Sequence, residues 1–249
     1  MGGNVALIKH SHATTMTGLH VEESFKEAGF PEGTVQLVII SKDQSNKLIE
    51  DERIQGVTIT GSTQSGKAIA KLAASHLKKQ VMELGGSDPY IIRDDVDLDE
   101  IMPECVRGRV SNWYQIFKLN LLMQISGQCC VASKRYLVME SIYDKFVDKY
   151  VAHMKNVKIG DPFDKNTDMG PMARNDLRDT VAKQVDQAVQ EGAKLLLGGK
   201  VPSSKGNFYP PTVLTCSPDN LACRDEIFGP VAAIIKVKYT RKKILTLGT

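Results

Sequence analysis

The feature that most constrains the fold is a regular alternation of short apolar segments with longer amphipathic ones. Apolar runs such as 35–40 (VQLVII) and 56–60 (GVTIT) have the length and composition of buried strands. Segments such as 14–28 and 175–191 carry apolar residues at the spacing of a helix that buries one face. Because buried strands that alternate with helices pack as parallel neighbours, the pattern predicts an α/β fold whose parallel sheet is covered on both faces.

The rest of the chain continues this alternation. We expect further strands at 4–9, 81–84, 89–92, 136–139 and 194–199, and further helices at 44–51, 62–77, 94–110 and 142–155. The composition changes near 83–86 (ELGG), which is where we expect a domain boundary.

The composition limits which binding partners and which cellular compartment we expect for this chain. A net charge of +3 over 249 residues is too small to indicate nucleic-acid binding. The longest apolar run, 113–125, contains Lys118 and is too short to cross a bilayer, so we expect no membrane partner. The five cysteines show no C-x-x-C spacing and no zinc pattern with histidine, which favours a reducing compartment over a disulfide scaffold or a metal site. We expect a cytoplasmic location, with the mitochondrial matrix as the alternative.

A turn of small residues follows the expected strand at 56–60. Gly61, Ser62 and Gly66 lie in GSTQSG, where the turn leads into a helix. Backbone N–H groups at such a helix N-terminus can bind a phosphate. The string is neither G-x-G-x-x-G nor a Walker loop, and a structural turn capped by Ser62 is the commoner reason for it.

Glu83 stands at the end of an apolar strand, ahead of two glycines. A buried carboxylate in such a place can have a raised pKa and act as a general base. The simpler interpretation of this segment alone is a surface glutamate at a strand end.

Two adjacent cysteines, Cys129 and Cys130, follow a Gly-Gln pair and precede Lys134 and Arg135. A thiol acts as a nucleophile when it is ionised, which helix N-terminal N–H groups or a nearby cation favour. We expect this turn to lead into a helical stretch that supplies such groups. For either cysteine alone, a buried and unreactive thiol is the ordinary expectation.

Four motifs, in this order, resemble the aldehyde dehydrogenase superfamily: GSTQSG (61–66), ELGG (83–86), GQCC (127–130) and EIFGPV (226–231). The longer strings ELGGSDPYII, DMGPMARNDLRD and EGAKLLLGG are most similar to the succinate-semialdehyde dehydrogenase branch. The resemblance implies a partial Rossmann-type NAD(P)-binding domain at 1–83 and an α/β catalytic domain at 84–238. The tail at 239–249 does not follow the family pattern.

The resemblance also implies roles for single residues. Cys130 matches the nucleophile, which would form first a thiohemiacetal and then a thioester with the substrate. Glu83 matches the base that would activate water. Lys9 would contact the adenosine ribose, and Glu226 the nicotinamide ribose with Phe228 beside the ring. The full set of expected cofactor-binding residues is Lys9, Ser11, His12, Gly61, Ser62, Gly66, Leu84, Glu226 and Phe228.

The implied cofactor is NAD or NADP. Three residues after Lys9 the family often has a glutamate that repels a 2′-phosphate, and here that position is His12, which favours tolerance of NADP. The implied partner is a small-molecule aldehyde, with succinate semialdehyde as the expectation from the branch. Ser111 stands where some relatives have an arginine for the distal carboxylate. Arg107, Arg109 and Arg135 are candidates to replace it, although we interpret all three first as surface ions.

The chain departs from the family at 113–125. Fourteen residues separate Asn112 from Gly127, where the family has one, so we interpret 113–125 as an insertion, either retained intron sequence or an error in the gene structure. The resemblance also indicates a truncated chain, without counterparts of the segments that supply the oxyanion-hole asparagine and the oligomer contacts. Loss of one oxyanion donor typically costs about a hundred- to a thousandfold in rate.

Two classes of function follow. The first is an oxidoreductase that converts an aldehyde to its acid with NAD(P)⁺. The second is a non-catalytic remnant that at most binds nucleotide or a homologous subunit. An acylating enzyme that delivers its thioester to coenzyme A has less support, because it would not need Glu83. The full-length family forms homo-oligomers, an expectation that we do not extend to this chain.

If 113–125 is retained intron sequence, transcripts that join codon 112 directly to codon 126 exist. Deep sequencing of cDNA across this junction tests the interpretation. Reads that always carry the intervening codons would contradict it.

Overall fold

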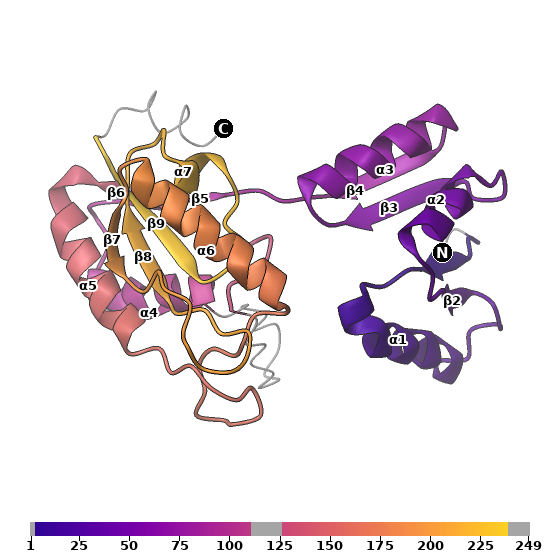
Figure 1. Ribbon diagram of the computed structural model, residues 1–249, viewed down its shortest axis with the longest axis horizontal. Helices are drawn as coiled ribbons and strands as arrows, with labels where there is room; N and C mark the ends of the chain where they lie inside the picture. The colour runs from indigo at the N-terminus through magenta and orange to yellow at the C-terminus, as the bar shows by residue number, and fades with distance from the viewer. Residues whose placement is uncertain (1–2, 111–125, 239–249) are drawn as a thin grey trace. The chain divides into compact units, whose positions relative to one another are not determined.

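The computed structural model describes residues 3–110 and 126–238. The expected insertion at 113–125 and the expected tail at 239–249 lie outside these residues. The chain divides into two compact units, Met1–Leu84 (unit 1) and Gly85–Thr249 (unit 2). Each unit is built from strands that alternate with helices (Figure 1).

Unit 1 contains short parallel strand pairs flanked by helices. Its elements are β1 (Ala6–Ile8), η1 (His12–Thr14), α1 (Thr15–Glu27), β2 (Val35–Leu37), α2 (Lys42–Glu50), β3 (Gly56–Thr60), α3 (Thr63–Ser75) and β4 (Lys79–Glu83). Strand β1 pairs with β2, and β3 pairs with β4, both in parallel.

Two helices of unit 1 begin at serine caps that the sequence makes visible. Ser41 Oγ accepts a hydrogen bond from Gln44 N at 3.2 Å, and the Gln44 side chain accepts from Ser41 N, which makes a capping box. For this reason α2 begins at Lys42, two residues before the expected start. Ser62 Oγ accepts from Ser65 N at 3.2 Å and fixes the start of α3.

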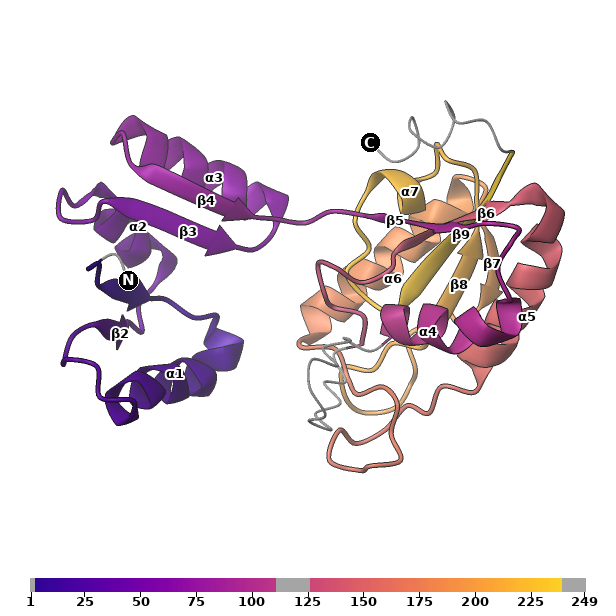
Figure 2. The ribbon, with the colours of Figure 1, turned by 180° about the vertical axis from the view of Figure 1, so that it is seen from behind.

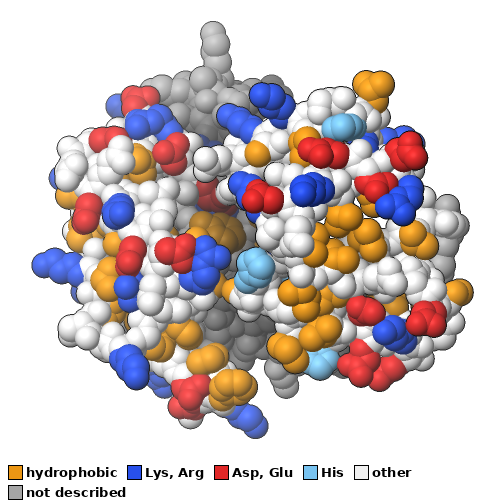
Figure 3. Space-filling view, turned by 45° about the vertical axis from the view of Figure 1, so that its right-hand side comes forward, with side chains coloured by type: hydrophobic (Ala, Val, Ile, Leu, Met, Phe, Trp, Pro, Cys, Tyr) orange, Lys and Arg blue, Asp and Glu red, His pale blue; other side chains and the backbone are white. Residues whose placement is uncertain are grey.

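Unit 1 buries little apolar surface. Among its described residues, the buried apolar side chains are Ile49 and Ala73. The strand expected at 35–40 is correct only for 35–37, and the expectation that it is buried is wrong, since Ile39 is 64% exposed. Helix α1 contacts β2, but no buried cluster forms around this strand among the described residues. Figure 3 shows hydrophobic side chains among charged ones on the face that it draws.

Unit 2 is organised around a five-stranded sheet in the order β5-β6-β9-β8-β7. Its elements are β5 (Pro89–Ile92), α4 (Leu98–Val110), β6 (Arg135–Met139), η2 (Glu140–Ile142), α5 (Tyr143–Lys155), α6 (Asn175–Gln190), β7 (Lys194–Leu197), β8 (Thr212–Thr215), α7 (Leu221–Arg224) and β9 (Val231–Val237).

Helices cover both faces of this sheet, as the sequence predicts. Successive residues of a strand point to opposite faces. In β6, Tyr136 and Val138 pack with α4 and α5, whereas Leu137 and Met139 pack with α6 and α7. Figure 1 shows α6 over one face, and Figure 2 shows α4 across the other. Strands β6, β8 and β9 therefore contribute side chains to two apolar cores, one on each face of the sheet.

The expectation of an all-parallel sheet is wrong at one edge. Strand β7 pairs antiparallel with β8, with an irregularity between Leu195 and Leu197. The chain returns from β7 to β8 without a crossover helix, so the two strands run in opposite directions. No helix of the described part of the chain has the length and apolar character needed to cross a membrane.

The contrast in burial predicts unequal local stability. Amides of β6 and β9 should exchange with solvent much more slowly than those of β3 and β4, because opening the sheet of unit 2 exposes two apolar cores. Hydrogen exchange followed by mass spectrometry measures this. Equal protection of β4 and β9 would contradict the assignment of the stable core to unit 2.

Candidate active site

The two cysteines lie in a tight turn, residues 126–133, which we call the cysteine turn. It opens with Ser126 and Gly127 at φ of 51° and 71°, both in the left-handed region. A β-carbon on Gly127 would lie 2.5 Å from the Arg109 carbonyl oxygen and 2.9 Å from the Gly229 carbonyl oxygen. Gly127 N donates to Val110 O at 3.1 Å. Both backbone angle and space therefore require glycine here.

The turn presents Cys130 at the surface. Cys130 is exposed and Cys129 is half-buried. Gln128 Oε1 accepts a hydrogen bond from Ala173 N at 2.8 Å, which anchors the turn to the loop before α6. The expected helix after the cysteines is wrong, because the chain enters strand β6 at Arg135. Helix N–H groups from a following helix are thus not the source of positive potential here.

Lys134 links the cysteine turn to a distant segment of the chain. Its Nζ donates to the Cys130 carbonyl oxygen at 2.5 Å and lies 3.0 Å from Glu226 Oε1. The Lys134 side chain is 3% exposed, and that of Glu226 is 21% exposed. A buried ammonium group needs such partners, since an unpaired one is costly to desolvate. Lys134 thereby sets the spacing between Cys130 and Glu226.

Arg109 holds the segment 226–231, which we call the Glu226 segment. The Arg109 side chain is completely buried, so the interpretation of Arg109 as a surface ion is wrong. Its Nε donates to Val231 O at 2.7 Å, and its Nη2 donates to the carbonyl oxygens of Ile227 (2.9 Å) and Gly229. Burial lowers the pKa of Arg109 from its usual value. The guanidinium shapes the backbone that presents Glu226.

The other two arginines considered for the distal carboxylate of the substrate form contacts within the protein. Arg107 pairs with Glu104 at 3.1 Å, and Arg135 Nε donates to Ser87 O at 2.5 Å. Ser111 lies outside the described residues.

In unit 1, the GSTQSG turn contacts Glu83 and Leu84, the first two residues of the ELGG segment. Thr60 pairs with Glu83 in the β3–β4 register, and Gly61 N donates to Glu83 O at 3.0 Å. A β-carbon on Gly66 would lie 2.4 Å from Leu84 Cδ2, so the Leu84 side chain packs directly against this glycine. The spacing of the two motifs is thus explained by direct contact.

Glu83, Gly61 and Ser62 are exposed together at the carboxyl ends of parallel strands. This edge is where open α/β sheets bind ligands. Ser62 caps α3, so the positive end of that helix faces the same edge. The exposed side chain of Glu83 contrasts with the buried carboxylate considered from the sequence.

Lys9, Ser11 and His12 follow β1 directly and are exposed. Lys9 Nζ donates to His10 O at 3.2 Å, and Ser11 Oγ accepts from Ala13 N at 3.3 Å. These side chains also lie at the carboxyl end of a parallel strand.

The structure divides the expected residues between the two units. Cys130, Glu226 and the half-exposed Phe228 belong to unit 2. The other expected residues belong to unit 1: Lys9, Ser11, His12, Gly61, Ser62, Gly66, Glu83 and Leu84.

Sequence reasoning missed the roles of Arg109 and Lys134. Arg109 falls at helical spacing from Met102 and Cys105, on the buried face of α4, and this spacing is a signal that could have identified it. The sequence around Lys134 carries no comparable signal.

Comparisons with a family model and with known proteins all match aldehyde dehydrogenases. The family model described as the aldehyde dehydrogenase family matches residues 1–246. A succinate-semialdehyde dehydrogenase [NADP(+)] of Mycobacterium avium (strain 104) is 41% identical over 237 residues, which are 95% of this chain and 48% of that protein. The corresponding protein of Mycobacterium leprae (strain TN) is 40% identical over 235 residues, 94% of this chain and 49% of that protein. The chain spans about half the length of the curated relatives it matches.

Solved structures share the α/β fold, as expected from the sequence. The succinic semialdehyde dehydrogenase of Streptococcus pyogenes with NADP⁺ is 34% identical with a TM-score of 0.88, over 98% of this chain and 51% of that one. The betaine aldehyde dehydrogenase of Staphylococcus aureus with NAD⁺ is 31% identical with a TM-score of 0.87, over 98% of this chain and 47% of that one.

The geometry of Gly127 predicts a large stability cost on substitution. Gly127→Ala should lower the free energy of unfolding by about 3 kcal/mol, since it adds a Cβ to a left-handed residue and overpacks the space beside two carbonyl oxygens. Gly86→Ala is the control: no atom lies within 4 Å of its added carbon, so the change should be below about 0.5 kcal/mol. Urea unfolding measures both. Equal effects would contradict the packing described for the cysteine turn.

Proposed function

The chain belongs to the aldehyde dehydrogenase family, and from this premise we propose that it oxidises an aldehyde to its carboxylic acid with NAD⁺ or NADP⁺. The observation that carries the proposal is the cysteine turn: Cys130 is exposed, and Lys134 connects it to Glu226. A reactive thiol has to be accessible and held in a fixed position, and this arrangement supports both.

The residues present fit a dinucleotide. Gly61 leaves backbone exposed beside the N-terminus of α3, where a pyrophosphate is favoured by the helix dipole. Lys9, Ser11 and His12 stand at the end of β1, in place to meet the adenosine half, with Gly66 and Leu84 supporting the turn. In unit 2, Glu226 and Phe228 would hold the nicotinamide half. Accordingly we assign cofactor binding mainly to unit 1, the nucleophile Cys130 to unit 2 and the base Glu83 to unit 1.

Cys130 performs the first chemical step in this mechanism. Its thiolate attacks the aldehyde carbon, the carbonyl π electrons move to oxygen, and a thiohemiacetal forms. When bound, the cofactor supplies the oxidant that removes a hydride from this carbon. Cys130 then carries the acyl group as a thioester.

Glu83 performs the last step. Its carboxylate takes a proton from water, the resulting hydroxide adds to the thioester carbon, and the Cys130 thiolate leaves with the acid as product. The exposure of Glu83 in unit 1 gives this carboxylate access to water.

We propose succinate semialdehyde as the substrate, because similar proteins bear that name. Arg109 does not serve as the distal carboxylate ligand, since its described hydrogen bonds go to backbone carbonyls in the core. His12, in place of a glutamate, supports acceptance of NADP⁺. The five free thiols support a reducing compartment such as the cytoplasm.

A second candidate is a chain that binds nucleotide without turnover. The small buried core of unit 1 favours it, because a loosely packed unit positions Glu83 and the cofactor poorly.

The assay that separates the two candidates uses the purified chain with succinate semialdehyde and either NAD⁺ or NADP⁺. We expect absorbance of the reduced cofactor to grow, and Cys130→Ala to abolish it. The neighbouring Cys129→Ala is the matched control and should retain the activity. Activity that survives Cys130→Ala would contradict the mechanism. Cofactor binding in a thermal-shift test, with no activity in any variant, would support the second candidate.

Glu83→Gln should separate oxidation from hydrolysis. Without the base, the first turnover proceeds and the acyl group stays on the sulfur. Intact-mass spectrometry after addition of aldehyde and cofactor should reveal an acyl adduct that Cys130→Ala lacks. Unchanged steady-state turnover in Glu83→Gln would contradict the role of Glu83.

A further inference from the structure

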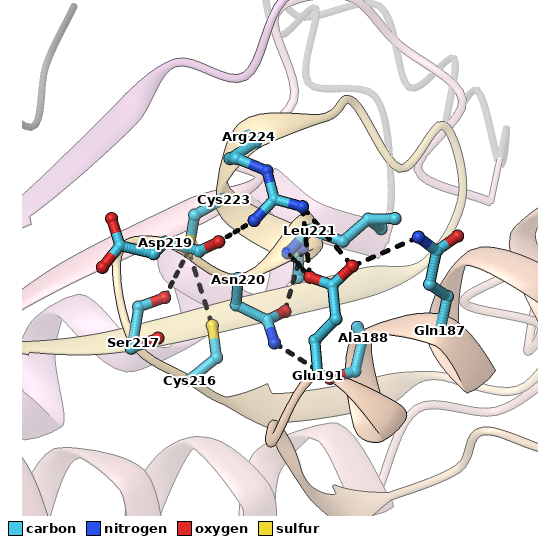
Figure 4. Close-up of polar contacts among 11 residues, drawn as sticks. Gln187, Ala188, Glu191, Cys216, Ser217, Asp219, Asn220, Leu221, Cys223 and Arg224 are labelled. Atoms are coloured by element: carbon cyan, nitrogen blue, oxygen red, sulfur yellow. Dashed lines mark hydrogen bonds and ion pairs between the residues drawn. The ribbon is translucent and has the colours of Figure 1, made fainter.

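Two cysteines outside the candidate active site face each other across a short loop. Cys216 directly follows β8, and Cys223 lies in α7, and their Sγ atoms are 3.4 Å apart (Figure 4). We propose that this pair is an oxidation site, which a peroxide closes into an intrachain disulfide and a thiol reductant reopens.

The surrounding contacts hold α7 in the position that keeps the sulfurs together. Asn220 Oδ1 accepts from Ala222 N at 3.0 Å, and Asn220 Nδ2 donates to Ala188 O at 2.9 Å. Glu191 Oε2 accepts from Leu221 N at 2.8 Å (Figure 4). The loop is thus clamped to the end of α6, and the two thiols remain neighbours in the folded chain.

The movement that the two sulfur atoms need to form a disulfide is small. A disulfide bond is about 2 Å long, so the sulfurs have to approach by roughly 1.4 Å. Rotation about the Cα–Cβ bonds of two side chains can supply such a shift without displacing the clamped backbone. Cys216 is half-buried rather than enclosed, which gives a small peroxide a route to the pair.

The surroundings of the two thiols shift their pKa values in opposite directions. The hydrogen bond from Cys216 lowers the pKa of Cys223, and the charges of Arg135 and Arg224 lower it further. The same contact, together with burial, raises the pKa of Cys216.

The reaction balances with peroxide as the oxidant. The thiolate of one cysteine attacks one peroxide oxygen and expels hydroxide, giving a sulfenic acid. The sulfur of the other cysteine then attacks the sulfenic sulfur, loses its proton, and expels the hydroxyl as water. Overall, two thiols and one hydrogen peroxide become one disulfide and two waters.

A metal site is less consistent with this pair. Structural zinc takes four ligands, and the part of the chain that the structure describes contains no group of three or more potential metal-binding side chains. The pair also plays no part in the proposed aldehyde chemistry, so its oxidation can be tested independently of that proposal.

The sequence allows a direct test. Trypsin cleaves after Lys205 and Arg224, and leaves both cysteines in one peptide, 206–224. After treatment of the folded chain with hydrogen peroxide, this peptide should weigh two hydrogens less and resist N-ethylmaleimide until it is reduced. Peptide 94–107, which contains the buried Cys105, is the internal control and should still be alkylated after unfolding.

Variants and an unfolded reference complete the experiment. Cys216→Ser and Cys223→Ser should each abolish the mass loss, whereas Cys105→Ala should retain it. The wild-type chain in urea should form the disulfide more slowly than the folded chain. The proposal is overturned if peptide 206–224 keeps two alkylatable thiols at a peroxide dose that oxidises the exposed Cys130. It is equally overturned if the folded and unfolded chains react at the same rate.

Discussion

The buried ammonium group of Lys134 is the contact on which the candidate site in unit 2 depends. It joins the carbonyl of Cys130 to the carboxylate of Glu226, two groups nearly a hundred residues apart in sequence. Because the ammonium is almost fully enclosed, neither partner can be removed without leaving a charge short of compensation. Cys130 and the Glu226 segment are consequently fixed relative to each other by one side chain.

Arg109 supports this link through its hydrogen bonds to the Glu226 segment. It binds three carbonyl oxygens of the Glu226 segment, and its own carbonyl lies against Gly127. Helix α4 of unit 2 thus contacts both segments that the Lys134 contact joins. The sandwich of helices around β6 and β9 provides the rigid base for these contacts, since both strands are buried on two faces.

Local signals in the sequence predict much of the fold. The Ser62 cap of α3, the apolar run of β6 and the change at ELGG depend on neighbouring residues, so the sequence reveals them. The antiparallel β7 and the exposure of residue 39 depend on which strands meet in space, which local patterns do not encode. The same holds for the site. Family motifs make Cys130 and Glu226 candidates, but the burial of Lys134 and the contact of Cys216 with Cys223 arise only from tertiary packing.

The most direct test of the central claim is a double-mutant cycle between Lys134→Met and Glu226→Gln. Far-UV circular dichroism in urea would measure the free energy of unfolding of unit 2 in the two single variants and the double variant. A coupling energy of about 1–3 kcal/mol is predicted, because the two side chains form one desolvated pair. Effects that add to within about 0.5 kcal/mol would show that the pair is not coupled and would contradict the account.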